Sequence, residues 1–346
     1  MSAPVSIAVI GCGHLGRFHA KLYREMPEAQ LICVVDLNEE RAAAVGTEFD
    51  VPGRTDLAQA LAEAEAWSIA TPTSSHADVA TAGLDAGKHV LIEKPITTTA
   101  EEGRALVALA QRRQRVLAVG QTERWNPAFR AALPSLRAPH FIESHRLAPF
   151  VERGLDVDVV LDLMIHDLDI TLSLLRDPIR SIDAVGVPVL TAGEDIANAR
   201  IRFESGAVAN LTASRVSRER TRKIRFFGAQ RYVSVDLLEA KVEEVILESI
   251  GIDAPLDPGG APVSAEEMLM AELRSRGLRL RHGSVPVATG NALLEELRDF
   301  VRAVRGAPLE GASGADGLRN LEVALEVRRC VRDSLAALAA RSREGA

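Results

Sequence analysis

The fold is decided by the stretch Val5-Ser6-Ile7-Ala8-Val9-Ile10-Gly11-Cys12-Gly13-His14-Leu15-Gly16, in which an apolar run leads directly into a G-x-G-x-x-G motif. An apolar strand followed by this motif and a helix is typical of a dinucleotide-binding loop. We expect Gly11 to allow the tight turn out of the strand, Gly13 to let a pyrophosphate approach the backbone, and Gly16 to let the helix pack closely. The helix is expected to begin near Leu15, directly after His14, where free backbone amides face the phosphate charge.

Asp36 lies directly after a second apolar run, residues 31–35, and twenty residues after Gly16. A carboxylate at this distance accepts hydrogen bonds from the hydroxyls of an adenosine ribose. It also repels a 2′-phosphate, so the acid favours NAD over NADP. The order of strand, glycine loop, helix, strand and acid therefore predicts an NAD-binding unit. The alternative is that the glycines only mark an ordinary turn.

Short apolar strands alternate with helical segments up to about residue 122. The predicted strands are 5–10, 31–35, 67–70, 89–92 and 116–119, and the predicted helices are 15–25, 39–45, 57–62, 77–86 and 100–112. Apolar strands separated by helices indicate a parallel sheet that is covered on both faces. Ligands of such sheets bind beyond the carboxyl ends of the strands.

The pattern changes after Asn126 and Pro127. Alternating stretches at 140–146, 182–190, 197–203, 207–214, 222–227 and 232–236 predict a mostly antiparallel sheet with an apolar helix, 159–175, on one face. Glycines and prolines between 255 and 262 predict an exposed excursion, and two helices follow at 292–304 and 315–339. We therefore predict an α/β chain with a Rossmann doubly wound parallel sheet over 1–123, an α/β domain with an open, mostly antiparallel sheet over 124–312, and a C-terminal helix over 313–346 that packs back on the body.

The composition excludes several classes of protein. The 346 residues are 47% hydrophobic, enough for substantial cores, and the net charge of −7 gives no reason to expect a nucleic-acid partner. No signal peptide or membrane span is predicted, because no apolar run is long enough. Cys12, Cys33 and Cys330 show neither metal-binding nor disulfide spacing, which favours a reducing cytoplasm.

Lys94 lies between Glu93 and Pro95 at the end of the fourth predicted strand. That position is at the ligand edge of the sheet, near the nicotinamide if NAD binds as predicted. Pro95 restricts Lys94 to an extended conformation, which holds the lysine at the strand tip. We count Glu93 and Lys94 among the candidate cofactor contacts, and Lys94 also as a candidate catalytic residue. The alternative is a solvated surface lysine.

The second candidate centre is the helix 159–175. Its polar residues Asp158, Asp162, His166, Asp169 and Ser173 recur at helical spacing and share one face. Asp162 and His166 form a plausible acid–imidazole pair, in which the carboxylate orients the ring and the other nitrogen takes a substrate proton. A structural contact inside the core is the alternative. Aspartate and histidine also bind metals, but no other His or Cys lies at a ligand spacing, so we predict no metal.

Further candidates line the predicted cleft. Thr71 and Pro72 end the third strand and are expected along the cofactor. His76 follows Ser74 and Ser75, which resemble a helix cap, so a structural role for it is favoured over a catalytic one. The segment 120–127 crosses between the two predicted domains, where it lines a cleft or acts as a hinge. From it we assign Gln121 to the cofactor and Arg124, Trp125 and Asn126 to the substrate. We add Arg215 from an arginine cluster at 215–225 that suits a substrate diphosphate; the alternative for each of these arginines is a solvated residue or a subunit contact.

Together these motifs resemble the Gfo/Idh/MocA family of NAD(P)-dependent oxidoreductases. The resemblance rests on residues 11–16, on Glu93-Lys94-Pro95, on Asp162 with His166, and on the stretch 316–323. It implies a Rossmann domain, a second domain that binds substrate and mediates oligomerisation, and a substrate cleft between them. It also implies homodimers or homotetramers built on the open sheet. By the same resemblance Lys94, Asp162 and His166 match the catalytic lysine, aspartate and histidine.

Within the family, residues 123–128 and 160–167 are similar to the bacterial group that oxidises the C3 hydroxyl of UDP-N-acetylglucosamine to a ketone. That ketone is transaminated on the route to amide-linked lipid A. Two alternatives stay open: oxidation or reduction of another sugar, nucleotide sugar or inositol, and a non-catalytic NAD-binding regulatory protein. Either His166 or Lys94 serves as the base in the implied reaction.

Overall fold

The computed structural model describes residues 3–150, 158–191, 193–249 and 272–344. The described residues form two compact units. The first contains residues up to 126 together with 160–173 and 290–329, and the second contains the other described residues. The glycine- and proline-rich stretch 255–262 lies outside the described residues. The domain boundaries expected from the sequence stay a prediction.

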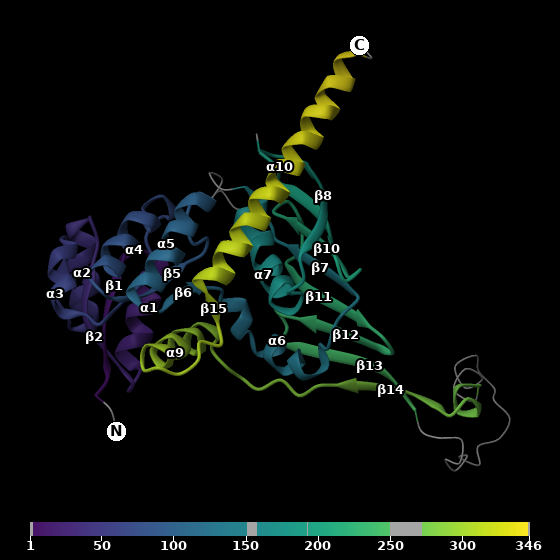
Figure 1. Cartoon of the computed structure of the whole chain (residues 1–346), viewed down its shortest axis with the longest axis horizontal. Helices are drawn as coiled ribbons and strands as arrows, with labels where there is room; N and C mark the ends of the chain where they lie inside the picture. The colour runs from purple at the N-terminus through teal and green to yellow at the C-terminus, as the bar shows by residue number, and fades with distance from the viewer. Residues whose placement is uncertain (1–2, 151–157, 192, 250–271, 345–346) are drawn as a thin grey trace. The chain divides into compact units, whose positions relative to one another are not determined.

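The first unit is built on a seven-stranded sheet in the order β15-β6-β5-β4-β1-β2-β3. Figure 1 labels β1, β2, β5, β6 and β15 of this sheet. Its strands are β1 (Val5–Ile10), β2 (Ala29–Val35), β3 (Gly53–Arg54), β4 (Ala66–Ile69), β5 (His89–Glu93), β6 (Leu117–Gly120) and β15 (Ala312–Ser313). All neighbouring strands are parallel except β15, which pairs antiparallel with β6. The very short β3 and β15 were not predicted.

Helices cover both faces of this sheet. They are α1 (His14–Glu25), α2 (Glu39–Phe49), α3 (Leu57–Glu63), α4 (His76–Asp85), α5 (Ala100–Arg113), α9 (Ala292–Val304) and the first part of α10 (Gly314–Glu344). Successive residues of β1 enter two separate cores: Ala8 and Ile10 join one with α4 and α5, and Ile7 and Val9 join the other with α1 and α9. This burial of both faces explains why the strands are continuously apolar in sequence.

Local sequence signals explain where several helices begin. The Asn38 side chain accepts a hydrogen bond from the Arg41 amide at the start of α2, and Asn291 does the same for the Leu294 amide at the start of α9. Thr99 and Glu102 form a capping box ahead of α5. Such caps satisfy backbone amides that have no partner within the helix.

The second unit is built on an eight-stranded sheet in the order β14-β13-β12-β11-β7-β10-β9-β8. Its strands are β7 (Phe141–Leu147), β8 (Ile179–Val187), β9 (Ile196–Phe203), β10 (Val208–Ser214), β11 (Thr221–Gly228), β12 (Arg231–Asp236), β13 (Lys241–Ser249) and β14 (Leu278–Ser284). Only β7 and β10 are parallel. The short helix α6 (Pro127–Ala132) packs against β12 and β13. The predicted fold class, a Rossmann sheet followed by a mostly antiparallel one, is confirmed.

The helix predicted over 159–175 differs in one respect. Residues Val160–Met164 form a π-helix, and a regular α-helix, α7, runs only from Ile165 to Leu174. A π-turn inserts an extra residue per turn and is frequent at functional sites. The α-helical spacing assumed for the polar face is therefore wrong before Ile165.

Among the residues that the structure describes, no helix is both long and apolar enough to cross a membrane.

Asp195 fixes the turn between β8 and β9. Its Oδ2 accepts hydrogen bonds from the amides of Val189, Leu190 and Thr191, and its Oδ1 accepts one from the Thr191 hydroxyl. Burial alone would raise the pKa of Asp195, but these hydrogen bonds lower it to about 2 from an ordinary value of 3.8. The carboxylate is therefore bound more tightly in its charged form than in its neutral form.

This geometry predicts a pH-dependent contribution to stability. Because the folded pKa is depressed, the contribution of Asp195 is complete above about pH 4 and is lost as the pH falls toward about 2. We expect Asp195→Asn to lower the free energy of unfolding by about 1.5–3 kcal/mol at pH 7. The difference should shrink in denaturant titrations at pH 3 and below. Asp183→Asn, an exposed site on β8, is the control, and an equal loss in both variants would contradict the assignment.

Candidate active site

The glycine loop between β1 and α1 is closed by tight backbone contacts. A Cβ on Gly11, whose φ is +101°, would lie 2.6 Å from the Ala70 carbonyl oxygen. A Cβ on Gly16 would lie 1.7 Å from the carbonyl oxygen of Gly11. A Cβ on Gly13, by contrast, would meet nothing within 4 Å. The loop thus presents bare backbone to open space at Gly13, which is the cradle that a pyrophosphate needs.

A pocket of about 510 Å³ opens beside this loop. It is lined by residues from the carboxyl ends of β1, β2 and β4, including Gly11, Gly13, His14, Leu15, Asp36, Leu37, Arg41, Thr71 and Pro72. The sequence had assigned most of these residues to the cofactor. The pocket fits the adenosine and phosphate parts of a dinucleotide, because it joins an anion-binding helix start to a carboxylate at the end of β2.

Asp36 is held by the loop that it faces. Its Oδ2 accepts a hydrogen bond from the Cys12 amide at 2.8 Å, and its Oδ1 accepts from the Asn38 amide and from Arg41. Burial alone would raise the pKa of Asp36, but these hydrogen bonds lower it below its ordinary range. Burial and the Asp36 charge raise the pKa of the Cys12 thiol to about 12, so Cys12 stays a neutral thiol.

Lys94 contacts the π-helix at Asp162. Its ammonium donates a hydrogen bond to the Asp162 backbone carbonyl at 3.0 Å and lies 3.9 Å from the carboxylate oxygen Oδ1. The lysine side chain is 20% exposed and that of Asp162 is 45% exposed, so both are accessible from solvent. The two predicted catalytic residues therefore come together although they are 68 positions apart in the chain.

His166 is the second residue of α7. It follows Asp162 across the junction between the π-helix and the α-helix, and it is half-buried in the same compact unit as Lys94. Most other residues of α7 are buried, so the position of the helix is fixed by packing on several sides. Lysine, aspartate and histidine are thus carried by two rigid segments of one unit.

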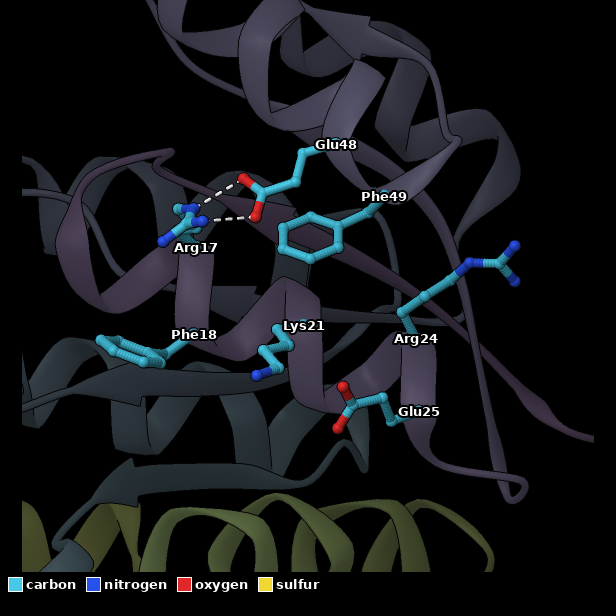
Figure 2. Close-up of a pocket in the computed structure, with 7 residues that line it drawn as sticks. All are labelled: Arg17, Phe18, Lys21, Arg24, Glu25, Glu48 and Phe49. Atoms are coloured by element: carbon cyan, nitrogen blue, oxygen red, sulfur yellow. Dashed lines mark hydrogen bonds and ion pairs between the residues drawn. The ribbon is translucent and has the colours of Figure 1, made fainter.

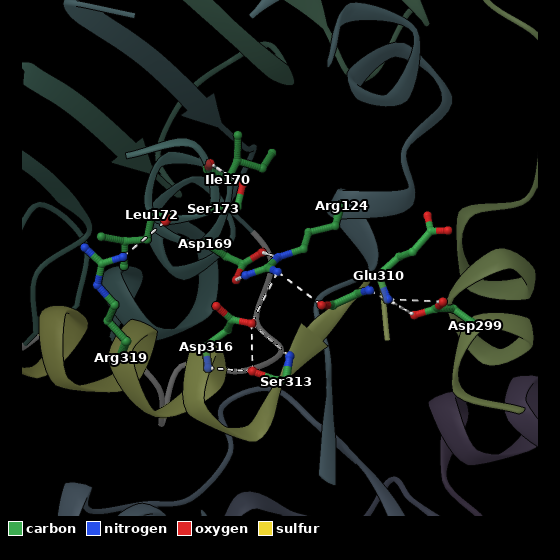
Figure 3. A network of polar contacts seen from close by, with 11 residues as sticks. Arg124, Asp169, Ile170, Leu172, Ser173, Asp299, Glu310, Ser313, Asp316 and Arg319 are labelled. Atoms are coloured by element: carbon green, nitrogen blue, oxygen red, sulfur yellow. Dashed lines mark hydrogen bonds and ion pairs between the residues drawn. The ribbon is translucent and has the colours of Figure 1, made fainter. Parts of the chain in front are cut away.

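The substrate residues predicted from 124–126 are largely covered. Arg124 and Trp125 are buried, and the Asn126 amide donates a hydrogen bond to the Glu123 carboxylate. Arg124 is paired with Asp169 of α7 (Figure 3). Arg215 lies in the second unit after β10, where it too is buried. Substrate binding by these four residues stays a prediction.

His76 and Gln121 are tied to backbone near the ends of β4, β5 and β6. His76 Nδ1 lies 2.9 Å from the Pro95 carbonyl oxygen, and its Nε2 lies 2.9 Å from that of Thr71. The Ser75 hydroxyl donates hydrogen bonds to the Pro72 carbonyl oxygen and the Thr71 hydroxyl oxygen. It accepts none from the first amides of α4, so the predicted serine cap is wrong. Gln121 is buried, and its backbone carbonyl accepts a hydrogen bond from the Arg124 backbone amide. A cofactor contact by either residue stays a prediction.

Sequence reasoning missed a buried acidic cluster beside Lys94. Glu93 points inward, where one of its oxygens lies 3.0 Å from His19 Nε2. Glu296 of α9 accepts a hydrogen bond from the Thr122 hydroxyl, and burial together with the Glu93 charge holds its pKa well above the ordinary range. Two features of the sequence could have indicated this cluster: His19, three residues after Gly16, and Glu296, within the apolar face of the helix predicted over 292–304.

A second hollow of about 260 Å³ lies on α1 and the end of α2 (Figure 2). It is lined by Arg17, Phe18, Lys21, Arg24, Glu25, Glu48 and Phe49, none of which was predicted to bind cofactor or substrate. Arg17 and Glu48 form a two-pronged ion pair at its edge.

In the part of the chain that the structure describes, no group of three or more His, Cys, Asp or Glu side chains is arranged to hold a metal ion.

Comparison with known proteins agrees with this geometry. Residues 5–121 match the Gfo/Idh/MocA oxidoreductase family, described as an NAD-binding Rossmann fold, and residues 135–234 match the C-terminal domain of the same family. The chain belongs to the Gfo/Idh/MocA oxidoreductase family. The resemblance noted in the sequence is confirmed, and the first unit contains the family's NAD-binding Rossmann fold.

Several Gfo/Idh/MocA relatives are informative. The chain is 41% identical to UDP-N-acetylglucosamine 3-dehydrogenase of Acidithiobacillus ferrooxidans over 93% of its own length and 96% of the relative's. A solved structure of that enzyme aligns with a TM-score of 0.84 at 39% identity, covering 96% of this chain and 100% of the other. The WlbA dehydrogenase of Bordetella pertussis, solved with NADH and UDP-GlcNAcA, shares the fold with a TM-score of 0.74 at 18% identity, covering 96% and 97% of the two chains.

Proposed function

We propose that this oxidoreductase catalyses the NAD-dependent oxidation of the C3 hydroxyl of UDP-N-acetylglucosamine to a ketone. The observation that carries the proposal is the 41% identity with a UDP-N-acetylglucosamine 3-dehydrogenase over 93% of the chain. The contact between Lys94 and Asp162 supports it, because it brings an ammonium and a carboxylate together, and His166 follows Asp162 by four positions in the chain. The ketone product is a substrate for transamination on the route to amide-linked lipid A.

The residues around the glycine loop fit a bound NAD. Bare backbone at Gly13 accepts the pyrophosphate, and the Asp36 carboxylate faces the ribose side of the pocket. When bound, NAD supplies the hydride acceptor of the reaction. We further infer that NAD contacts residues that lie at or after the ends of β4, β5 and β6 in the chain, namely Thr71, Pro72, His76, Glu93, Lys94 and Gln121.

The proposed chemistry uses three side chains. His166 takes the proton of the C3 hydroxyl, and Asp162 orients the imidazole and stabilises its charged form. Lys94 donates a hydrogen bond to the same oxygen, which stabilises the negative charge that develops as the hydride leaves. In the alternative, Lys94 rather than His166 takes the proton of the C3 hydroxyl.

We further propose that the reaction takes place in the cytoplasm, where reducing conditions keep the three cysteines as thiols.

The direct test is NAD⁺ reduction with UDP-N-acetylglucosamine, followed by NADH absorbance with the product identified by mass spectrometry. The proposal expects a product two hydrogen atoms lighter than the substrate. A panel of other nucleotide sugars, free sugars and inositols tests the first alternative. NADH binding without turnover on any member of the panel would instead support a regulatory protein.

We also propose that the open face of the second sheet joins copies of this chain in a homodimer or homotetramer. Phe141, Phe227 and Tyr232 form a partly exposed aromatic cluster on that face, with ring centroids 5.5 and 5.0 Å apart. Alternate residues of the same strands are buried on the opposite face. Partly exposed aromatic clusters of this kind are typical of protein interfaces.

Phe227→Arg is expected to disrupt this association. The substitution removes the contacts of the Phe227 ring and places a charge that must lose hydration at the interface, so the variant should run as a monomer. Light scattering coupled to size exclusion should give a multiple of the 37.2 kDa chain mass for the natural protein and a single chain mass for the variant. Arg180→Glu, an exposed site on β8, should leave the mass unchanged. A monomeric natural protein at micromolar concentration would contradict the proposal.

A further inference from the structure

Arg124 lies in the short turn Thr122–Trp125 that follows β6, and its guanidinium points at helix α7. Nε donates a hydrogen bond to Asp169 Oδ2 at 2.7 Å, and Nη2 donates one to Asp169 Oδ1 at 2.8 Å (Figure 3). The side chains are 9% and 2% exposed. A two-pronged arginine–carboxylate pair of this kind fixes orientation as well as distance, because both groups are planar.

The third nitrogen of the same guanidinium holds a further segment. Nη1 donates to the Gly311 carbonyl at 3.3 Å and lies 3.7 Å from Asp316 Oδ2. Asp316 in turn accepts hydrogen bonds from the Ser313 amide and hydroxyl, which shape the start of α10 (Figure 3). Arg124 therefore joins three segments of the first unit: the turn after β6, helix α7, and the connection into α10.

Helix α7 is held at two more points from α10. Asn320 Nδ2 donates to the Ile165 carbonyl at 3.0 Å, and Arg319 Nη1 donates to the Leu172 carbonyl at 3.2 Å. His166 lies between the anchor at Ile165 and the anchor at Asp169. Residues three apart on a helix lie on neighbouring positions of its surface, so the rotation of α7 that Asp169 fixes also sets the direction of the His166 imidazole.

The Arg124–Asp169 pair is buried on both sides. Burial alone would lower the pKa of Arg124, but Asp169 raises it above its ordinary value, whereas for Asp169 burial outweighs the Arg124 charge and raises the pKa of the carboxyl. Every nitrogen of the guanidinium already has an oxygen acceptor or ion-pair partner within the unit. Moving the arginine onto a substrate phosphate would leave Asp169 as a buried charge without compensation, which is strongly destabilising.

We propose that Arg124 positions helix α7, and with it His166, for the oxidation, and that it does so through Asp169 rather than by touching the sugar nucleotide. This inference rests on the proposed function, in which His166 is the base. It replaces the role of substrate ligand that the sequence suggested for Arg124. Arg124 is thus a positioning residue.

Two variants test this role. Arg124→Lys keeps the charge but loses the planar fork, and Asp169→Asn keeps the shape but loses the charge. Both should lower kcat by about 10–100-fold, because a misplaced base is costly even at small displacements. The KM for UDP-N-acetylglucosamine and the Kd for NADH should each change by less than about threefold. Arg104→Lys is the control, since Arg104 makes a similar pair with Glu322 on the surface of the same unit.

Hydrogen exchange gives a readout that does not depend on turnover. Amides of residues 165–174 should exchange at least about tenfold faster in both variants, while those of α1 keep their natural rates. If the natural protein does not oxidise UDP-N-acetylglucosamine, the proposed function fails on that protein alone, and the exchange of α7 still decides whether Arg124 holds the helix.

Two results would overturn the inference. A raised KM in Arg124→Lys, with kcat retained and with Asp169→Asn normal, would make Arg124 a substrate ligand. An unchanged kcat per NADH-binding site in both variants, with only the melting temperature lowered, would make the pair merely structural. Should either variant fail to fold, Asp169→Glu keeps both charges and lengthens the acid by one methylene. It should fold and still show the loss of kcat, and normal kcat in it would count against the inference.

Discussion

Replacing His166 by alanine is expected to lower turnover by about two to four orders of magnitude, which is the usual contribution of general acid–base catalysis. Without the imidazole, the hydroxyl proton has no acceptor in position when the hydride leaves. The cofactor pocket is lined by residues of β1, β2 and β4 and does not include His166. The Kd for NADH should therefore stay within about twofold of the natural value.

The measurement combines steady-state NADH formation with a fluorescence titration of NADH. His140→Ala is a matched control, because His140 is an exposed histidine of the second unit that was assigned no part in the site. Near-normal turnover in His166→Ala would reject the assignment of His166 as the base. If Lys94→Met then shows the larger loss and removes the acidic limb of the pH profile, where a base is lost to protonation, the lysine takes that role.

The sequence predicted the first sheet well because its strands are buried on both faces. Residues 5–10 and 292–304 were predicted with the bounds that β1 and α9 have in the structure. A continuous apolar run or a strong helical period leaves little ambiguity about the element. The two strands that were missed in the second sheet, β13 and β14, are rich in charge. Arg279 and Arg281 of β14 pair with Glu248 of β13, and such cross-strand pairs are invisible before the register is known.

The candidate site was only partly predictable for a related reason. Spacing along the chain suggested that Asp162 and His166 work together, but it gave no sign that residues 160–164 form a π-helix. It also identified Asp169 as part of a polar stripe on a buried helix, which must have partners. The partner proved to be Arg124, 45 positions away, and no local pattern connects the two. Contacts set by tertiary packing therefore account for most of what the sequence did not reveal.

Alanine substitutions at Gly13 and at Gly16 of the glycine loop are expected to cause different defects, weaker NADH binding in the first and lower stability in the second. Gly13→Ala should leave the protein folded, because its φ of −73° suits alanine and its Cβ would meet no atom within 4 Å. That Cβ would occupy the open space in which the pyrophosphate approaches the backbone. The Kd for NADH should therefore rise at least about tenfold, equivalent to about 1.4 kcal/mol, with little change in melting temperature.

Gly16→Ala should instead damage the fold. Its Cβ would lie 1.7 Å from the Gly11 carbonyl oxygen, so either the loop or α1 must move. Since both are packed against β1 and β4, the free energy of unfolding should fall by more than about 4 kcal/mol. The melting temperature should fall by roughly 10 °C. Gly193→Ala, whose Cβ also meets nothing within 4 Å, is the control for both assays. Normal NADH binding in Gly13→Ala would show that the cofactor does not approach the backbone at this loop. A normal melting temperature in Gly16→Ala would show that α1 does not pack as closely as the loop geometry requires.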